Sequence, residues 1–312
     1  MPDPLEQARD ENERRFALRL AGGFFALVSL TFCLIVLGAL VRANDAGLAC
    51  PEWPLCFGGL VPQMDLRVGF EWSHRVFAAL VSLSFATLAV LALRRAATRR
   101  IAGPWIALTA PLLALQVLLG ALTVWKLLAA WTVTAHLLSG NAFAVLLLLT
   151  ATALHDQAID RPPAPPAGTA AGRWVALAAA LLVLQIALGG LVSSRFAGLA
   201  CPEWPACSGG VWFPTWHGTV GLHLLHRLNA YALLAVLLAA SLSGGRAPRF
   251  RRLTRLALGL GIAQVVVGVG NVVLGMPVEV TGLHTGLAAA LVLSVALAAR
   301  EIISAAPIRS GC

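Results

Sequence analysis

The chain of 312 residues is 59% hydrophobic and only 12% charged, and its mean hydropathy is +0.82. A soluble domain carries roughly 25% charged residues, so this composition excludes a soluble globular enzyme and a disordered chain. The net charge of +9 comes from basic residues that lie in short loops between apolar runs, not in one patch. This distribution argues against nucleic-acid binding and places the chain in a lipid bilayer.

Long apolar runs divide most of the chain. A membrane-spanning helix needs about 20 apolar residues, and the first run is too long for the apolar region of a signal peptide. The sequence therefore predicts an all-α membrane protein with eight transmembrane helices. The predicted spans lie at about 20–42, 72–93, 103–125, 130–153, 174–195, 219–241, 253–275 and 280–299.

The basic residues predict the orientation of these spans. Most of them lie on one side of the predicted topology, in the two tails, in the loops 94–100 and 246–255, and in the linker 155–173. Basic loops stay in the cytoplasm. We therefore expect both termini in the cytoplasm and the loops rich in cysteine on the outer side.

The two halves of the chain share sequence. Residues 38–56 and 189–207 are identical at thirteen of nineteen positions, at an offset of 151. Matched histidines, glutamines and glycines follow at similar offsets, so we expect two pseudo-symmetric four-helix bundles related by an axis along the membrane normal. The predicted divisions are an N-terminal tail (1–19), a first bundle (20–154), a linker (155–173), a second bundle (174–300) and a C-terminal tail (301–312).

Four of the six cysteines form two pairs in the repeated outer loops, Cys50 with Cys56 and Cys201 with Cys207. Because the outer face of the membrane is oxidising, two loop disulfides are expected. Each disulfide is either a structural staple or a pair that exchanges with a thiol partner, and the staple is the favoured interpretation. Cys33, inside the first span, is expected to be a small core residue.

Four histidines occupy matched places in the two halves: His74, His136, His226 and His284. Each lies a few residues into an even-numbered span, so the four imidazoles are expected at similar shallow depths below the outer face. Two imidazoles from facing helices of a bundle can ligate one heme iron from both sides. The alternatives are hydrogen-bonded polar residues, a proton relay or a non-heme metal site.

One acid breaks the match between the halves. Glu71 lies three residues before His74, on the same helix face, whereas His223 occupies the matching position before His226. This asymmetry predicts chemistry in the first half, although the helix dipole alone also favours an acid at that place.

Further polar residues accompany these histidines. Arg75 and Arg227 directly follow His74 and His226, and each is either the partner of a heme propionate or a snorkelling residue. His217 lies at the mouth of the sixth span. His217 and His223 are each expected to support a ligand or to act as an alternative ligand.

Together these features resemble the heme A synthase family of the bacterial type, which has cysteine pairs in the outer loops. The resemblance rests on eight spans, duplicated four-helix bundles, the Glu-x-x-His-Arg motif of 71–75 and three further histidines, and it covers roughly residues 20–300. It implies a multi-pass protein of the bacterial inner membrane.

The resemblance implies a b-type heme between His226 and His284, and heme O as substrate between His74 and His136. The C8 methyl group of heme O would be oxidised to a formyl group by two hydroxylations, giving a geminal diol that loses water. Glu71 would be catalytic. Independently of the resemblance, a buried porphyrin needs room between helices, and we expect the small residues beside His136 and His284 to let it approach. These small residues are Ser139, Gly140, Asn141, Gly282 and Gly286.

Partners also follow from the resemblance. Heme O synthase, which is the upstream farnesyltransferase, would supply the substrate, and a terminal oxidase or its assembly factors would take the product. The sequence leaves the oligomeric state open, a homo-oligomer included.

Three other functions use the same residues differently. A diheme subunit that oxidises quinol needs the four histidines but not the asymmetry at Glu71. A periplasmic thiol-oxidising protein would act through the cysteine pairs. A transporter built from parallel repeats ranks last, because broken mid-membrane helices are not evident.

Overall fold

The computed structural model describes residues 4–245 and 247–304. Within these residues all eight predicted spans are α-helices, and each is long and apolar enough to cross a membrane. A helix of 25 residues is about 37 Å long, which exceeds the hydrocarbon core of about 30 Å. The helices are α1 (Pro4–Ala43), α2 (Leu66–Arg94), α3 (Ala96–Trp125), α4 (Ala130–Ala158), α5 (Thr169–Ser194), α6 (Gly218–Leu242), α7 (Pro248–Val273) and α8 (Val278–Ile303).

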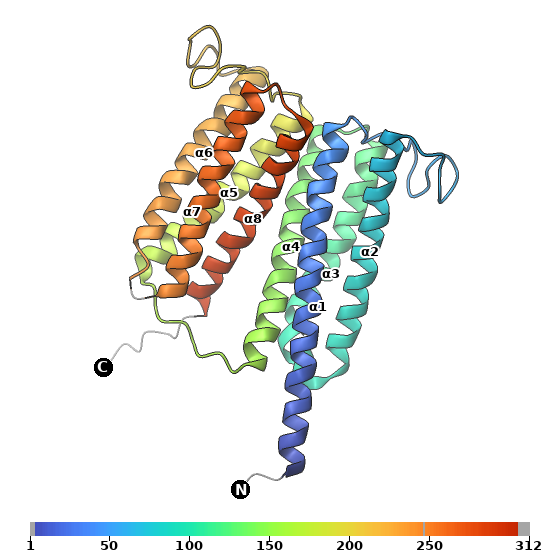
Figure 1. The fold of residues 1–312 in the computed structure, drawn as a ribbon, viewed down its shortest axis with the longest axis vertical. Helices are drawn as coiled ribbons and strands as arrows, with labels where there is room; N and C mark the ends of the chain where they lie inside the picture. The colour runs from blue at the N-terminus through green and yellow to red at the C-terminus, as the bar shows by residue number, and fades with distance from the viewer. Residues whose placement is uncertain (1–3, 246, 305–312) are drawn as a thin grey trace.

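The helices extend beyond the predicted apolar spans where polar residues support another turn. α1 begins at Pro4, so most of the segment expected as an N-terminal tail continues the first helix and projects from the bundle (Figure 1). An ion pair between Glu11 and Arg15, four residues apart, supports this exposed part. α2 begins six residues before the predicted span because the Asp65 side chain accepts a hydrogen bond from Val68 N at 2.8 Å.

Each half of the chain forms a group of four helices (Figure 1). In the first half, contacts follow the ring α1–α2–α3–α4 and return to α1, and in the second half they follow α5–α6–α7–α8 and return to α5. The second and fourth helices of each group therefore occupy opposite corners. This ring positions side chains of α2 and α4, or of α6 and α8, to face one another across a bundle.

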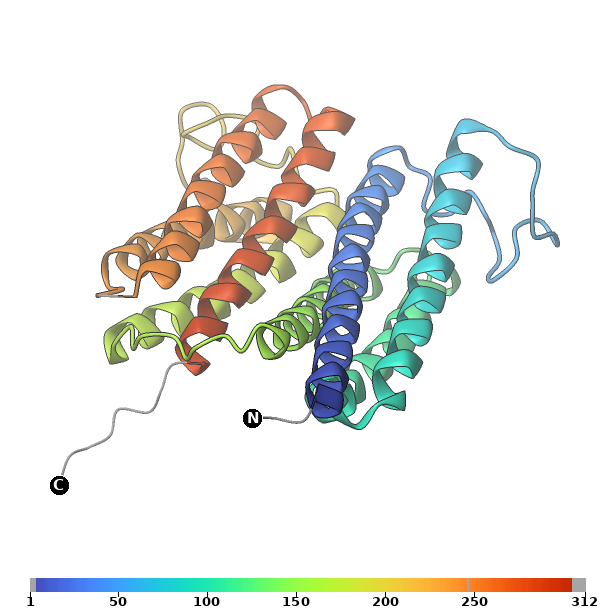
Figure 2. The ribbon, with the colours of Figure 1, turned by 60° about the horizontal axis from the view of Figure 1, so that its bottom comes forward.

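The two groups meet along α1 and α4 of the first half and α5 and α8 of the second (Figures 1 and 2). Glycines of α8 allow this approach. A Cβ atom added to Gly282 would lie 2.9 Å from the Leu40 side chain, and one added to Gly286 would lie 3.5 Å from Val36. The expectation that these two glycines make room for a porphyrin is wrong. They lie two residues from His284, about 200° around the helix, and so face α1.

Ion pairs join the halves at the end where α1 begins and α8 ends. Arg161, in the connection after α4, bonds Asp156 at 2.8 Å and Glu301 of α8 at 2.8 Å. Arg300 also bonds Asp156, at 2.7 Å. Burial alone would lower the pKa of Arg161, but its bonds to Glu301 and Asp156 outweigh burial and raise the pKa. The connection is thus held against both halves by charged groups.

Candidate active site

The four matched histidines lie on the opposite corners of the two helix rings. His74 is on α2 and His136 on α4, whereas His226 is on α6 and His284 on α8. Each is the seventh or ninth residue of its helix, at the end of the bundle that carries the cysteine loops. Each histidine therefore lies about 9–12 Å along the helix axis from the first residue of its helix. The expected common depth of the imidazoles below this end is therefore present in the structure.

A glycine on the preceding helix packs against each imidazole. Glycine is needed because a Cβ atom at any of these positions would lie closer to the ring than Cβ atoms normally lie to neighbouring atoms. The four glycines match one another across the repeat. A Cβ atom added to each would lie 3.0 Å (Gly38 to His74), 3.3 Å (Gly120 to His136), 3.2 Å (Gly189 to His226) and 3.0 Å (Gly268 to His284) from Cε1 of the ring.

Three of the four rings have a buried nitrogen without a hydrogen-bond partner in the described part of the chain. This atom is Nδ1 of His74, His136 and His284. It lies on the side of the ring that packs against the glycine, and a Cβ atom added to Gly38 would lie 3.6 Å from Nδ1 of His74. The rings themselves are only half-buried.

Each half offers one pair of imidazoles, which is the donor set that an iron porphyrin would require from the protein. Within residues 4–245 and 247–304, no three or more His, Cys, Asp and Glu side chains come together to hold a bare metal ion. A porphyrin already supplies four nitrogen ligands, so its iron needs only two imidazoles. The glycines let the rings pack directly against the preceding helices.

Two glutamines contact the imidazoles from the helix that precedes each histidine. Gln116 Nε2 lies 3.4 Å from His136 Nε2. Gln185 Nε2 lies 3.2 Å from Nδ1 and 3.3 Å from Nε2 of His226, and the Gln185 oxygen accepts a 2.7 Å bond from Asn229. Gln185 and Asn229 were not among the site residues predicted from the sequence. Leu34 matches Gln185 across the repeat, so the repeat gave no signal for this contact.

Glu71 is buried on α2 and bonded to the arginine one turn later. Arg75 Nε donates to Glu71 Oε1 at 2.9 Å. Nη1 of the same guanidinium donates to the backbone carbonyls of Glu52 at 2.7 Å and Leu55 at 2.9 Å. Arg75 therefore connects the buried Glu71 carboxylate to the first cysteine loop. Its N–H groups bond Glu71 and the loop carbonyls, and not the membrane surface, as a snorkelling arginine would.

The second half repeats the loop contact without the acid. Arg227 donates to the carbonyls of Cys201 at 2.8 Å, Glu203 at 2.8 Å and Ala206 at 3.1 Å. His223, at the position that matches Glu71, is buried, and its Nδ1 lies 2.9 Å from the Ala197 carbonyl. It is thus directed to the loop. The second half therefore has a buried histidine in place of the buried Glu71 carboxylate.

Both cysteine pairs are disulfides, as expected. Cys50 is bonded to Cys56, and Cys201 to Cys207. Their four residues are at most 2% exposed, and thiol exchange requires access to a sulfur atom. Burial therefore favours the structural staple. The expectation for Cys33 is wrong, because this cysteine is exposed on α1.

The second cysteine loop is also closed by its own acid. Glu203 accepts hydrogen bonds from the backbone N–H groups of Gly209 at 2.9 Å and Gly210 at 3.2 Å. These bonds lower the pKa of the exposed Glu203 carboxyl. In the first loop Glu52 bonds Gly58 N in the same way. Each loop is thus one closed unit, which a single arginine fixes to the helix below.

The remaining predicted residues lie away from the imidazoles or serve their own helix. His217 is exposed at the residue before α6. Ser139 bonds Gln116, and a Cβ added to Gly140 would lie 3.0 Å from Gln116 Nε2. Asn141 Nδ2 donates to the Leu137 carbonyl at 2.9 Å. The small residues of α4 therefore accommodate Gln116, which itself contacts His136.

Known proteins are similar to this chain along most of its length. The COX15-CtaA family, described as cytochrome oxidase assembly protein, matches residues 23–68 and 64–296. A heme A synthase of Methylobacterium sp. strain 4-46 is 30% identical in an alignment that covers 96% of each chain. A heme A synthase of Shewanella oneidensis is 29% identical over 86% of this chain and 92% of that protein. One of Mesorhizobium japonicum is 25% identical over 90% and 89%.

The family match covers most of the chain, and the relatives match along nearly their whole length. The match includes the helices that carry all four histidines and Glu71, as well as both cysteine loops. The chain belongs to the heme A synthase (COX15-CtaA) family of cytochrome oxidase assembly proteins.

Proposed function

We propose that the first half, α1–α4, holds heme O between His74 and His136 and is where its C8 methyl group becomes the formyl group of heme A. The second half, α5–α8, holds a b-type heme between His226 and His284. The overall reaction, heme O to heme A, is the activity of the family. The proposal is the assignment of the substrate to the first half and of the b-type heme to the second.

The observation that supports this assignment is Glu71, a buried carboxylate three residues before His74 on α2. The two histidine pairs share helix positions and a glycine against each ring, but among the described residues only His74 has a buried acid, Glu71, within one turn of its own helix. Oxidising a methyl group to a formyl group removes electrons and protons from carbon. A fixed carboxylate can accept such a proton, and it also stabilises positive charge that develops on the substrate.

The residues of the first half have separate tasks. His74 and His136 hold and orient the substrate, because imidazoles on opposite corners of the ring approach a flat ligand from its two faces. Arg75 fixes Glu71 and places a permanent positive charge beside it, since a guanidinium is always protonated. The methyl carbon is hydroxylated twice and loses four electrons, which pass to an electron acceptor outside this chain, and the geminal diol then loses water. When bound in the second half, the b-type heme supplies one-electron chemistry at its iron.

The orientation in the membrane is part of the proposal. The arginine-rich connections lie at the end where α1 begins and α8 ends. Since basic loops face the cytoplasm, the cysteine loops and both heme levels belong near the outer face of a bacterial inner membrane. Heme O synthase supplies the substrate from within the bilayer, and a terminal oxidase under assembly takes the product.

The experiment is expression of the full chain together with heme O synthase in a host that makes no heme A. Extracted pigments are then separated and their masses measured. The proposal predicts heme A in these cells, and heme b with the purified protein. Two b-type hemes with no conversion of heme O would contradict it and would favour a diheme electron-transfer subunit.

A further inference from the structure

A pair of side-chain amides lies against His226 in the second half. Gln185 Nε2 of α5 is 3.2 Å from Nδ1 and 3.3 Å from Nε2 of the imidazole. Asn229, three residues after His226 on α6, donates to the Gln185 oxygen at 2.7 Å and to the Leu181 carbonyl at 3.0 Å. Asn229 is buried, so the pair is part of the interior around His226.

The hydrogen bonds determine which end of the Gln185 amide meets the ring. A carbonyl oxygen only accepts, so the Asn229 group that bonds the Leu181 carbonyl is its NH2 group. The same NH2 group bonds the Gln185 oxygen. The NH2 group of Gln185 is therefore the group that lies beside His226.

The two nearly equal distances place this NH2 group over the face of the imidazole. An atom in the ring plane at the same distance from both nitrogens would collide with another ring atom, such as Cε1, which lies between the nitrogens. An N–H group over an aromatic face makes a weak favourable contact. Neither nitrogen lone pair is used by this contact, so it is compatible with an imidazole that ligates iron.

The same helix contacts the ring a second time. Gly189, four residues after Gln185 on α5, packs against Cε1 of His226. One contact is at the edge of the ring and the other is over its face, so together they oppose rotation of the imidazole. Groups that fix the orientation of a metal-binding imidazole change metal affinity about 10–100-fold when they are removed.

The repeat has no amide pair at the matching positions of the first half. Leu34 matches Gln185, and Phe77 matches Asn229. Neither of these side chains can donate or accept a hydrogen bond. His74 therefore has the glycine contact that His226 has, but not the hydrogen-bonded amides.

The other two helices that precede a histidine also have glutamine at this position. Gln116 of α3 lies four residues before Gly120, and Gln264 of α7 lies four residues before Gly268. Among the four helices whose glycines pack against the imidazoles, α1 alone has a leucine there. Leu34 is thus the exception to a pattern that the other three helices share.

We propose that Gln185, anchored by Asn229, is a positioning residue that holds His226 as a permanent ligand of the resident heme. The matching Leu34 leaves His74 freer to turn, so His74 is the ligand from which heme O is exchanged. This inference rests on the proposed function of the two halves. A substrate enters and a product leaves in every cycle, whereas a resident heme stays, so the two sites need different rates of release.

The test of the second half replaces Gln185 by the residue of the first. Wild type and Gln185→Leu are purified from cells without heme O synthase, and the electron paramagnetic resonance spectrum of the ferric heme is recorded. Its g-values depend on the orientation of the axial imidazole planes. Release of heme b to excess apomyoglobin is the second measurement.

We expect shifted g-values and about tenfold faster release in Gln185→Leu. Asn229→Ala, which removes the anchor of Gln185, should shift the g-values as well. A merely structural role would lower the heme content of the preparation and leave the g-values of the remaining heme unchanged. Unchanged g-values in both variants would overturn the inference.

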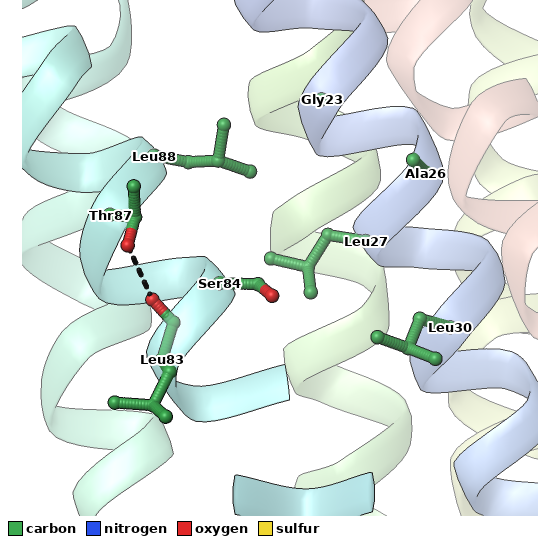
Figure 3. Close-up of a pocket in the computed structure, with 8 residues that line it drawn as sticks. All are labelled: Gly23, Ala26, Leu27, Leu30, Leu83, Ser84, Thr87 and Leu88. Atoms are coloured by element: carbon green, nitrogen blue, oxygen red, sulfur yellow. Dashed lines mark hydrogen bonds between the residues drawn. The ribbon is translucent and has the colours of Figure 1, made fainter. Parts of the chain in front are cut away.

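The test of the first half introduces the amides there, as Leu34→Gln combined with Phe77→Asn. Leu30→Gln combined with Phe77→Asn is the matched control, because Leu30 lies one turn farther along α1 and lines an apolar groove between α1 and α2 (Figure 3). Each protein is loaded with heme O in the absence of an electron acceptor and mixed with excess apomyoglobin. The masses of the retained pigments distinguish heme O from heme b.

We expect the wild type to release heme O faster than heme b. The variant with Leu34→Gln should retain heme O about tenfold longer, and the control should behave like the wild type. Equal release of the two hemes from the wild type, or equal release of heme O from the two double variants, would overturn the inference. A wild-type chain that binds only heme b would instead contradict the proposed function, whereas the spectra of Gln185→Leu test His226 separately.

Discussion

Arg75 holds Glu71 in a nearly buried ion pair, one helical turn apart on α2. Nε and Oε1 are 2.9 Å apart, and the two side chains are 14% and 9% exposed. Removing one partner from such a pair leaves an uncompensated buried charge, at a cost of about 3–5 kcal/mol. The same guanidinium holds the first cysteine loop, so the loop and the acid share one anchor.

Arg75→Lys should lower the rate of heme A formation about 10–100-fold, the usual effect of removing a group that orients an active-site residue. Lysine keeps the charge but has no planar fork to bond a carboxylate and two carbonyls together. Arg227→Lys is the matched comparison, because it loses only loop contacts. The measurement is heme A formed per resident heme. Equal losses in both variants would show that the acid pair has no special role.

Gly268→Ala should disturb the resident heme of the second half. The new Cβ would lie 3.0 Å from Cε1 of His284, and overpacking of this kind costs about 1–3 kcal/mol. Gly259, on the same helix, has open space at its Cβ position, so Gly259→Ala should stabilise the protein by about 0.4–1 kcal/mol. Heme content and the reduced-minus-oxidised spectrum distinguish them. An unperturbed spectrum in Gly268→Ala would argue against the packing described for His284.

The two histidine pairs should respond differently to substitution. His226→Ala should lose the spectrum of the resident b-type heme, because one axial ligand is gone. His74→Ala should keep that spectrum but form no heme A, since its site is for the substrate. Absorption spectra and pigment analysis of each purified variant test this. A full resident spectrum in His226→Ala would remove His226 as a ligand.

Glu301→Gln should destabilise the protein by about 3 kcal/mol. Glu301 is 4% exposed, and both of its oxygens bond Arg161, so the variant breaks a buried pair. Asp160→Asn is the control, because Asp160 and its partner Arg14 are more than half exposed and such pairs contribute about 0–1 kcal/mol. Thermal unfolding in detergent compares the two. Equal midpoints would mean that the buried cluster does not hold the halves together.

The arrangement of helices could be predicted from sequence because lipid imposes it. Runs of apolar residues long enough to span a bilayer have few alternatives to helix, and the repeat placed matched histidines at matched depths. Helix ends were less predictable: α1 extends to Pro4 through charged residues that form pairs of their own.

Contacts within the site were harder to predict because they depend on which way a helix face points and on how loops fold back. Gly282 and Gly286 lie close to His284 in sequence but face α1. The bonds of Arg75 go to carbonyls of a loop twenty or more residues earlier, and backbone carbonyls leave no mark in a sequence. Gln185 has no counterpart in the repeat, so only the packed structure reveals its contact with His226.

The most direct test of the central claim is pigment analysis of the Glu71→Gln variant, expressed with heme O synthase and compared with the wild-type chain. Glutamine keeps the size of the side chain and removes the charge. The account predicts that the variant retains its b-type heme and heme O but makes at least 100-fold less heme A, since a positioned acid or base contributes about 10²–10⁴-fold. Heme A at the wild-type level from a variant with an intact resident spectrum would contradict it.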